Sequence, residues 1–251
     1  MAGQSSPAAV LWDVDDTLFD YTTADRTGMW RHLTDEGTSA RYGDVEEALR
    51  VWREHTDRCW ARFAAGEATF EEQRRDRVRA FLAAPGEAER AMSDAEADAW
   101  FDRYLRHYEA AWALFPDVLP ALDALADGYR HGVLSNSSIH NQDRKLRVLG
   151  VRDRFEVVLC AAELGVAKPA PEAFHAACDA LGLAPHEVVY VGDHPDIDAV
   201  GAREAGLLPV WLDRGGWSGA VVSDLRRITT LAELPALLGR TTRFGAPSTF
   251  G

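Results

Sequence analysis

The sequence predicts an α/β protein that carries an all-helical insertion, and three patterns in its 251 residues indicate this fold class. Residues 10–12 form a short apolar run. Residues 21–115 repeat apolar side chains at helical spacing, and after residue 116 short apolar runs alternate with helical segments. Such alternation is typical of a parallel sheet covered by helices on both faces. We expect three parts: a Rossmann-like, doubly wound core of residues 1–20 and 116–240, a helical domain of residues 21–115, and a flexible tail at 241–251.

The first expected strand, residues 10–12, leads directly into Asp13 and Asp15, and Thr17 follows. Side chains at i and i+2 of an extended segment point the same way, so the two carboxylates should face one small volume. Like charges that close repel each other, and a magnesium ion would relieve the repulsion because it prefers oxygen ligands. An Asp-rich turn without a function is the alternative interpretation.

Four amphipathic helices are expected in residues 21–115, which should pack as a four-helix bundle. Five of the eight tryptophans lie in this segment. Aromatic side chains at this spacing usually form the core of a bundle, although a stacking site for a cofactor or nucleobase is the alternative. The expected helices run from Thr23 to Glu36, from the Asp44 cap to Gly66, from the Thr69 cap to before Pro85, and from the Ser93 cap to before Pro116.

After residue 116 the strands should be parallel, and in such open sheets the ligand site lies outside the carboxyl ends of the strands. The residues that follow each strand are therefore the informative ones. The expected strands are 131–134, 157–160, 188–191 and 208–212, and the expected helices are 117–127, 140–149, 171–181, 196–205 and 231–238.

Two of these strands are followed by groups suited to a phosphate. Ser135 and Asn136 offer a hydroxyl and backbone amides for phosphate oxygens, although a polar turn that caps the next helix is the alternative. Lys168, one of only two lysines among 27 basic residues, stands beside a proline beyond the next strand. A compact point charge suits a phosphate site, whereas a solvated surface lysine is the plain interpretation.

The strand at 188–191 ends in Gly192 and Asp193, and Asp198 follows five residues later. The glycine allows a close approach of the backbone, and the carboxylates could bind a cation or merely cap the next helix. Because all four polar clusters should emerge at the same edge of the sheet, they support a common site more strongly together than separately.

Composition narrows the class of partner and the compartment. A net charge of -13 argues against binding a nucleic-acid polymer, whose backbone attracts clustered cations. Residues 1–7 lack a signal-peptide pattern, and no apolar run reaches transmembrane length, so no membrane association is expected. Cys59, Cys160 and Cys178 are odd in number and lie among apolar residues, which fits reduced thiols in a cytoplasmic protein.

Taken together, these motifs resemble the haloacid dehalogenase (HAD) superfamily, in its phosphatase branch with a helical cap inserted after the first motif. The resemblance covers roughly residues 8 to 239, and it departs from the family at Asp16, where glycine is common. The matching positions are Asp13 to Thr17 for the first motif, Ser135 for the second, Lys168 for the third, and Gly192 and Asp193 with Asp198 for the fourth.

The resemblance implies a Mg2+-dependent phosphomonoester hydrolase that works through an aspartyl-phosphate. Asp13 would be the nucleophile and Asp15 the general acid and base, with Thr17 ordering the loop around Asp15. The resemblance further implies that Mg2+ is held by the carboxylates of Asp13 and Asp193 and the carbonyl of Asp15, with Asp198 in support. The phosphoryl group would be held by Ser135, the Asn136 amide and Lys168.

The expected substrate is a small phosphorylated metabolite, such as a nucleoside monophosphate, a flavin-pathway phosphate or a sugar phosphate. The presence of Asp15 disfavours dehalogenation, because a halide needs no proton to leave, and residues 21–115 contain no lysine for the Schiff base of phosphonate hydrolysis. A phosphosugar mutase of the same superfamily and a non-catalytic binding protein with this fold remain as alternatives.

Overall fold

The computed structural model describes residues 6–83, 89–215, 219 and 225–239. Contacts within the chain divide it into two units, one formed by the segment up to Asp20 together with Ala113 onward, and one formed by Tyr21–Trp112. Each unit is described by itself.

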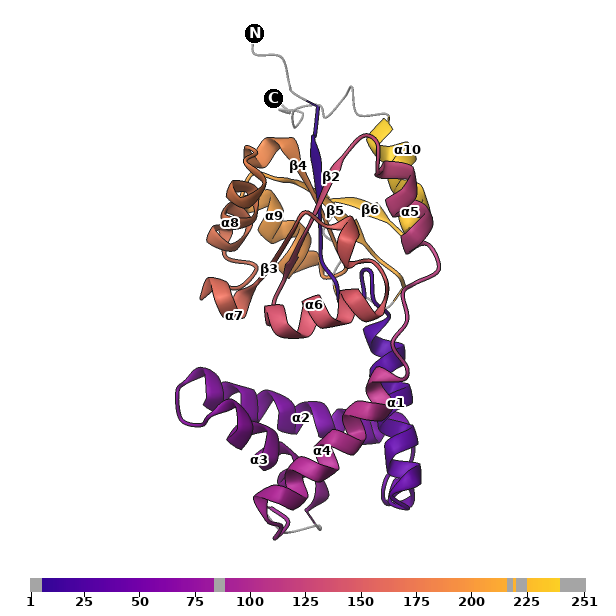
Figure 1. Ribbon diagram of the computed structural model, residues 1–251, viewed down its shortest axis with the longest axis vertical. Coiled ribbons are helices and arrows are strands. Elements are labelled where there is room, and N and C mark those ends of the chain that lie inside the picture. Colours follow the sequence, from indigo (N-terminus) through magenta and orange to yellow (C-terminus); the bar gives the residue numbers. More distant parts are fainter. Residues whose placement is uncertain (1–5, 84–88, 216–218, 220–224, 240–251) are drawn as a thin grey trace. The chain divides into compact units, whose positions relative to one another are not determined.

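The first unit contains a six-stranded parallel sheet with the order β3-β2-β1-β4-β5-β6 (Figure 1). The central strand β1 is fully buried, which explains why it reads as a continuous apolar run. The strands are β1 Ala9–Trp12, β2 Arg130–Ser135, β3 Val157–Cys160, β4 Val188–Gly192, β5 Leu208–Leu212 and β6 Arg226–Ile228.

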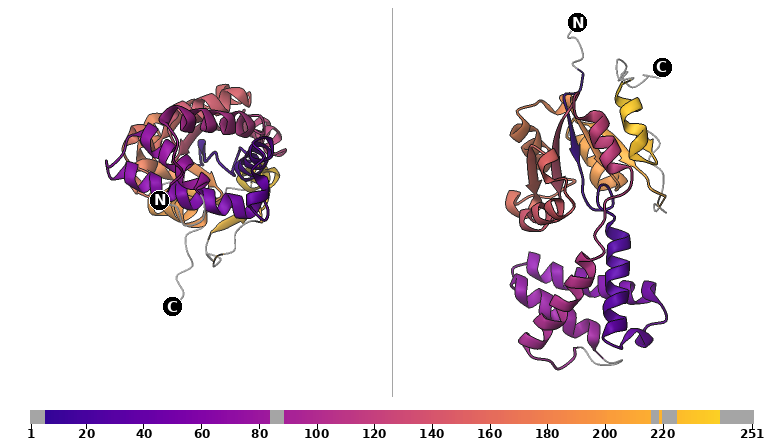
Figure 2. Two further views of the ribbon diagram at one scale, coloured as in Figure 1. Left: turned by 90° about the horizontal axis from the view of Figure 1, so that it is seen from below. Right: turned by 45° about the vertical axis from the view of Figure 1, so that its right-hand side comes forward.

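Helices cover both faces of this sheet, as the two views of Figure 2 also show. On one face Leu11 of β1 and Tyr190 of β4 pack in a common core with Phe174 of α8, whose ring centroid lies 5.1 Å from that of Tyr190. The α/β class and the doubly wound parallel sheet are thus confirmed. The helices are α5 Val118–Leu125, α6 Ile139–Val148, α7 Ala161–Leu164, α8 Pro171–Leu181, α9 Gly201–Glu204 and α10 Leu234–Gly239.

The described part of the second unit contains four α-helices with a shared apolar core, α1 Tyr21–Asp35, α2 Val45–Ala64, α3 Phe70–Leu82 and α4 Asp94–Glu109. Asp44, Thr69 and Ser93 cap α2, α3 and α4 through their side chains, as the sequence indicated. Trp52 and Trp100 are buried with their ring centroids 5.7 Å apart, so these aromatic residues belong to the core. Trp60 differs, because it is 48% exposed.

Among the described strands and α-helices, the edge strand β6 and the short helix α7 were not expected from the sequence. The helix expected at 196–205 also differs, since residues Pro195–Val200 form a π-helix before α9 begins. There the amide of Ala199 donates to the carbonyl of His194 five residues earlier, at 3.4 Å. Such π segments often occur at functional sites. The expected tail at 241–251 lies outside the described residues.

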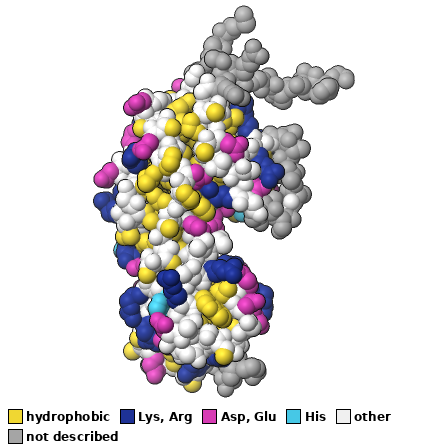
Figure 3. Space-filling view, turned by 90° about the vertical axis from the view of Figure 1, so that its right-hand side faces the viewer, with side chains coloured by type: hydrophobic (Ala, Val, Ile, Leu, Met, Phe, Trp, Pro, Cys, Tyr) yellow, Lys and Arg dark blue, Asp and Glu magenta, His cyan; other side chains and the backbone are white. Residues whose placement is uncertain are grey.

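Several compositional expectations can be compared with the fold. Cys59, Cys160 and Cys178 are all buried and free, as expected. Among the described residues no helix has both the length and the apolar character needed to cross a membrane. On the face shown in Figure 3, basic and acidic side chains are interspersed, so this face carries no continuous basic surface.

Candidate functional site

The parallel register brings the carboxyl ends of three strands to one edge of the sheet. Trp12 of β1 pairs with Val133 of β2 on one side and with Val191 of β4 on the other. Asp13 follows β1 directly, Ser135 ends β2, and Asp193 follows β4. The register therefore places these polar residues, which are far apart in the sequence, at the same edge.

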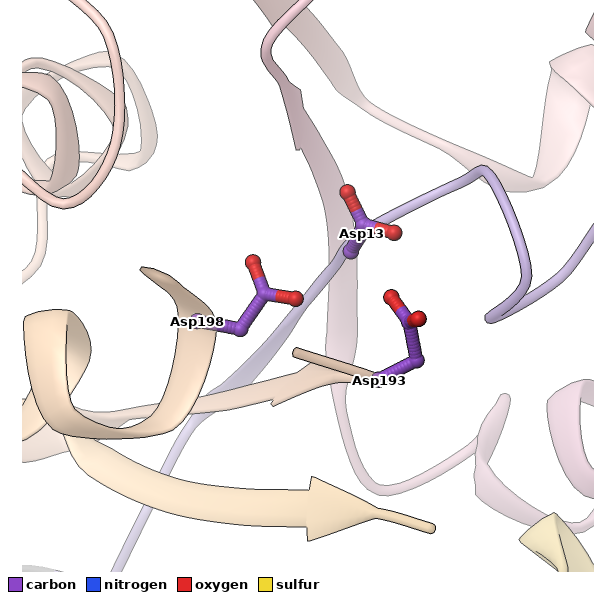
Figure 4. Close-up of side chains that lie close together, drawn as sticks. All are labelled: Asp13, Asp193 and Asp198. Carbon is purple, nitrogen blue, oxygen red and sulfur yellow. The ribbon is translucent and has the colours of Figure 1, made fainter. Parts of the chain in front are cut away.

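Three carboxylates converge at this edge, those of Asp13, Asp193 and Asp198 (Figure 4). One oxygen of each lies within 4.8 Å of the others. Burial raises the pKa of Asp13 to about 7, with Lys168 opposing the effect, and burial together with Asp13 raises the pKa of Asp193 to about 8. The raised pKa values show that these carboxyl groups disfavour being ionised together, and a bound cation would relieve their mutual repulsion.

The Lys168 ammonium group lies within this cluster and is almost fully buried. Its Nζ donates hydrogen bonds of 2.7 Å to Asp13 Oδ1, Asp198 Oδ1 and the Tyr190 hydroxyl. Burial alone would disfavour the charge, but Asp13 and Asp198 raise the pKa of Lys168 well above its usual value. Lys168 is therefore a fixed positive charge in contact with the oxygen of Asp13.

Asp198 is positioned by the backbone around it as well as by Lys168. Its Oδ2 accepts a hydrogen bond of 3.0 Å from the amide of His194. A Cβ atom on Gly192 would lie 2.4 Å from the Asp198 carboxyl carbon, so only glycine allows β4 to end this close to Asp198. This close approach was expected at Gly192 from the sequence.

Asp15 is held by two side chains of α6 that the sequence analysis did not assign. Lys145 Nζ forms an ion pair with Asp15 Oδ1, and Gln142 Nε2 donates to Asp15 Oδ2 at 2.8 Å. Gln142 Nε2 also donates to Ser135 Oγ at 3.0 Å, so it connects the first and second motifs. The two residues are one helical turn apart, which places both on the same face of α6.

Two other expected residues make side-chain contacts that the sequence did not specify. Thr17 Oγ1 donates to Asp13 Oδ2 at 3.1 Å, so its side chain orients Asp13. The Asn136 side chain donates to the Lys168 carbonyl and accepts from the Lys168 amide, both at 2.8 Å. The Asn136 side chain thus fixes the loop of Lys168, which leaves its backbone amide for a phosphate.

Asp16 is the described non-glycine residue with a positive φ angle, at 58°. Its amide donates to the Phe19 carbonyl at 2.8 Å and closes a tight turn. Left-handed backbone favours glycine, and aspartate tolerates it better than most residues. The positive φ angle explains why glycine is common at this position and why aspartate can replace it.

The donor set at this edge can hold a hard divalent cation. Within the described residues the Asp193 carboxylate accepts no hydrogen bond, and Asp13 Oδ2 accepts only the one from Thr17. Carboxylate oxygens that remain open in a crowded acidic cluster are the ligands that Mg2+ takes, together with water and substrate phosphate. Asp198 contributes less to such a site, because both of its oxygens already accept hydrogen bonds.

Comparison with known proteins finds a matching family model and related sequences. A family model described as haloacid dehalogenase-like hydrolase matches residues 7–206. The chain is 35% identical to a phosphoserine phosphatase from Thermus thermophilus over 82% of this chain and 88% of that protein. It is 27% identical to the N-acylneuraminate-9-phosphatase of Rattus norvegicus, over 94% and 95% of the two chains.

A solved structure with a similar fold is the HAD-hydrolase YfnB from Bacillus subtilis, which was determined bound to magnesium. The TM-score is 0.73 and the identity 21%, over 94% of this chain and all of that one. At this identity the likeness concerns the fold.

Proposed function

The chain belongs to the haloacid dehalogenase-like hydrolases and is a phosphomonoester hydrolase; we propose that it uses Asp13 as nucleophile and Mg2+ as cofactor. The observation that carries this proposal is the pairing at the sheet edge. Asp13 and Asp15, the two carboxylates of the first motif, each contact one of the two lysines of the chain. In phosphoryl transfer, Asp13 can then act as the attacking group and Asp15 as the group that transfers the proton.

In the first step an oxygen of Asp13 attacks the phosphorus atom of the substrate. A phosphorus–oxygen bond forms to Asp13 while the ester bond breaks, and Asp15 gives its proton to the departing alkoxide. In the second step Asp15 takes a proton from water, the water oxygen attacks the phosphorus, and Asp13 leaves as a carboxylate. Inorganic phosphate and an alcohol are the products.

The residues around Asp13 support its role as an ionised nucleophile. Lys168 donates to one of its oxygens and Thr17 to the other, which limits how its carboxylate can rotate. Gln142 and Lys145 in the same way fix the direction in which Asp15 exchanges a proton. A carboxyl group must be oriented as well as available to act as an acid or base.

Mg2+ would be held by the carboxylates of Asp13 and Asp193 and the carbonyl of Asp15, and when bound it neutralises charge on the phosphoryl oxygens. Ser135, the Asn136 amide and Lys168 would bind the same group. By the family resemblance, we also propose that the helical unit is a cap that selects small phosphomonoesters. The buried free thiols support the expected cytoplasmic location.

The proposal is tested by measuring phosphate release from the purified chain, with Mg2+ and with excess chelator. The substrate panel should hold phosphoserine, N-acetylneuraminate 9-phosphate, nucleoside monophosphates, flavin mononucleotide and sugar phosphates. We expect Mg2+-dependent turnover of one class above the others. Interconversion of phosphosugar isomers without phosphate release would instead identify a mutase.

Asp13→Asn should lower kcat by at least about 10⁴-fold, because an amide cannot form the acyl-phosphate under these conditions. Asp196→Asn is the matched control, because Asp196 is an exposed carboxylate three residues from Asp193. It should retain kcat within about threefold. Circular dichroism confirms that both variants are folded, and a folded Asp13→Asn variant with substantial turnover would overturn the nucleophile assignment.

A further inference from the structure

The helical unit holds a half-buried arginine that forms no ion pair with a described residue. Arg77 lies on α3, and its guanidinium carbon is 4.6 Å from the ring centroid of Trp52 and 5.0 Å from that of Phe101. Its Nη1 donates to Thr56 Oγ1 at 3.3 Å. Its Nε is buried and makes no hydrogen bond to a described residue.

The other arginines of α3 behave differently. Arg74 and Arg75 pair with Asp98, and Arg79 pairs with Asp94 and Asp76. A charged side chain taken out of water is costly unless it is paired and hydrogen-bonded. Consistent with this cost, burial lowers the pKa of Arg77 below its usual value. Arg77 therefore lacks the carboxylate partners that the other arginines of α3 have, which leaves its charge available to an external anion.

Arg77 lines a pocket of about 450 Å³ whose walls are mainly aromatic. This volume is within the range of small-molecule sites in proteins. Every residue that lines the pocket belongs to the helical unit, so the pocket does not depend on the other unit. Its main lining residues are Trp52, Phe101, Tyr104, Tyr108, Arg53 and Arg77.

The charge balance of the pocket favours an anion. Arg53 is already paired with the buried Asp25 at 3.0 Å, and Asp25 also accepts from the Tyr104 hydroxyl at 3.2 Å. Burial raises the pKa of Asp25, and Arg53, Tyr104 and Arg77 oppose this rise, Arg77 without a hydrogen bond to it. Asp57 lines the pocket as well, but it is exposed and forms no ion pair with a described residue. The uncompensated charge on the aromatic wall is thus positive.

We propose that this pocket binds a small organic carboxylate with a flat, apolar body. The carboxylate would accept charge-assisted hydrogen bonds from the Arg77 guanidinium, and its body would pack against the aromatic walls. Arg77 is already half-buried and held over two aromatic rings, so little reorganisation is needed when the anion binds. The carboxylate could belong to the phosphorylated substrate itself or to a separate metabolite, and the same chemistry recognises both.

The test compares the binding of phenylacetate and of its neutral isostere phenylacetamide to the full chain. Isothermal titration calorimetry and the intrinsic tryptophan fluorescence of the chain give two independent readouts. We expect phenylacetate to bind in the millimolar range or tighter, and at least tenfold more tightly than phenylacetamide. Equal affinities for acid and amide, or no binding of the acid up to 20 mM, would overturn the proposal.

Three variants locate the effect. Arg77→Met should abolish the preference for the acid, whereas Arg77→Lys should keep part of it because the charge remains. Arg75→Met removes a guanidinium from the same helix that is paired with Asp98, and it should bind phenylacetate as the wild type does. Loss of the preference in Arg75→Met, or its persistence in a folded Arg77→Met variant, would also contradict the site.

Kinetics separate the two sources of the carboxylate. If the pocket binds the substrate, phenylacetate should inhibit phosphate release competitively, and Arg77→Met should raise KM for carboxylate-bearing phosphomonoesters more than for p-nitrophenyl phosphate. If it binds a separate metabolite, phenylacetate should change the rate without competing. The calorimetric and fluorescence measurements need no turnover. They therefore test the carboxylate pocket independently of the proposed phosphatase activity.

Discussion

The sheet unit buries Lys168 and the helical unit half-buries Arg77, and the two charges are compensated in opposite ways. In the sheet unit, Lys168 contacts two carboxylates and a tyrosine hydroxyl. In the helical unit, Arg77 contacts aromatic faces and one threonine hydroxyl. A fully paired buried cation organises groups that the protein already holds, whereas an unpaired one favours a group that must come from outside.

The largest expected effect tests the paired side of this comparison. Lys168→Met leaves Asp13 and Asp198 buried without their cation, so we expect a loss of about 3–5 kcal/mol in the free energy of unfolding. Arg77→Met separates no ion pair and should stay within about 1 kcal/mol of the wild type. Urea unfolding at pH 8 in chelator measures both. Equal losses in the two variants would remove the distinction.

An intermediate effect concerns the second lysine. Lys145→Met leaves Asp15 without its ion-pair partner, so kcat should fall by about 100-fold while KM changes by less than about threefold. The pH dependence of kcat should also shift, which a merely structural role would not cause. Arg147→Met on the same helix, where Arg147 is exposed and paired with Asp143, is the control. A changed KM with an unchanged pH profile would indicate that Lys145 serves folding alone.

The smallest expected effect is on the acid stability of the helical unit, which buries the titratable side chain of His32. His32 is fully buried against Trp100, and burial lowers its pKa to about 4 from 6.5. His32 takes up a proton near pH 6.5 in the unfolded chain but only near pH 4 in the folded one. The contribution of neutral His32 to the free energy of unfolding is therefore fully present above pH 6.5 and is lost as the pH falls toward 4.

His32→Leu should remove this acid-dependent loss, which amounts to about 2 kcal/mol between pH 6.5 and 4.5. Urea unfolding of the variant and the wild type at a series of pH values gives the difference. Parallel curves for the two proteins would show that His32 takes up a proton without cost in the folded state.

The sheet unit could be predicted largely from the sequence because its site residues follow strands directly. Asp13, Ser135 and Asp193 each stand at a strand end, and parallel register then brings them together. Lys168 could be singled out because lysine is rare in this chain. The same scarcity was the signal that could have found Lys145, but its position inside a helix resembled that of any solvated basic residue.

The pocket of the helical unit had no comparable signal. Arg77 lies on a helix with three other arginines, and only the packing of three helices distinguishes it from them. The aromatic residues were expected to form the core, and Trp52 and Trp100 do so. That one side of this core also lines a pocket depends on side-chain geometry, which periodicity does not specify. The π-helix that contains Asp198 was not predicted either, because its extra residue per turn leaves no mark in the sequence pattern.

The scarcity of lysine has a further consequence for chemical labelling. Only two side chains of this protein carry a primary amine, and both are nearly buried at the carboxylates of the first motif. An acylating reagent directed at amines therefore finds no lysine target on the surface. Any side-chain mass increment that accumulates under native conditions reports how often the sheet edge opens, and its rate can be followed by mass spectrometry without a substrate.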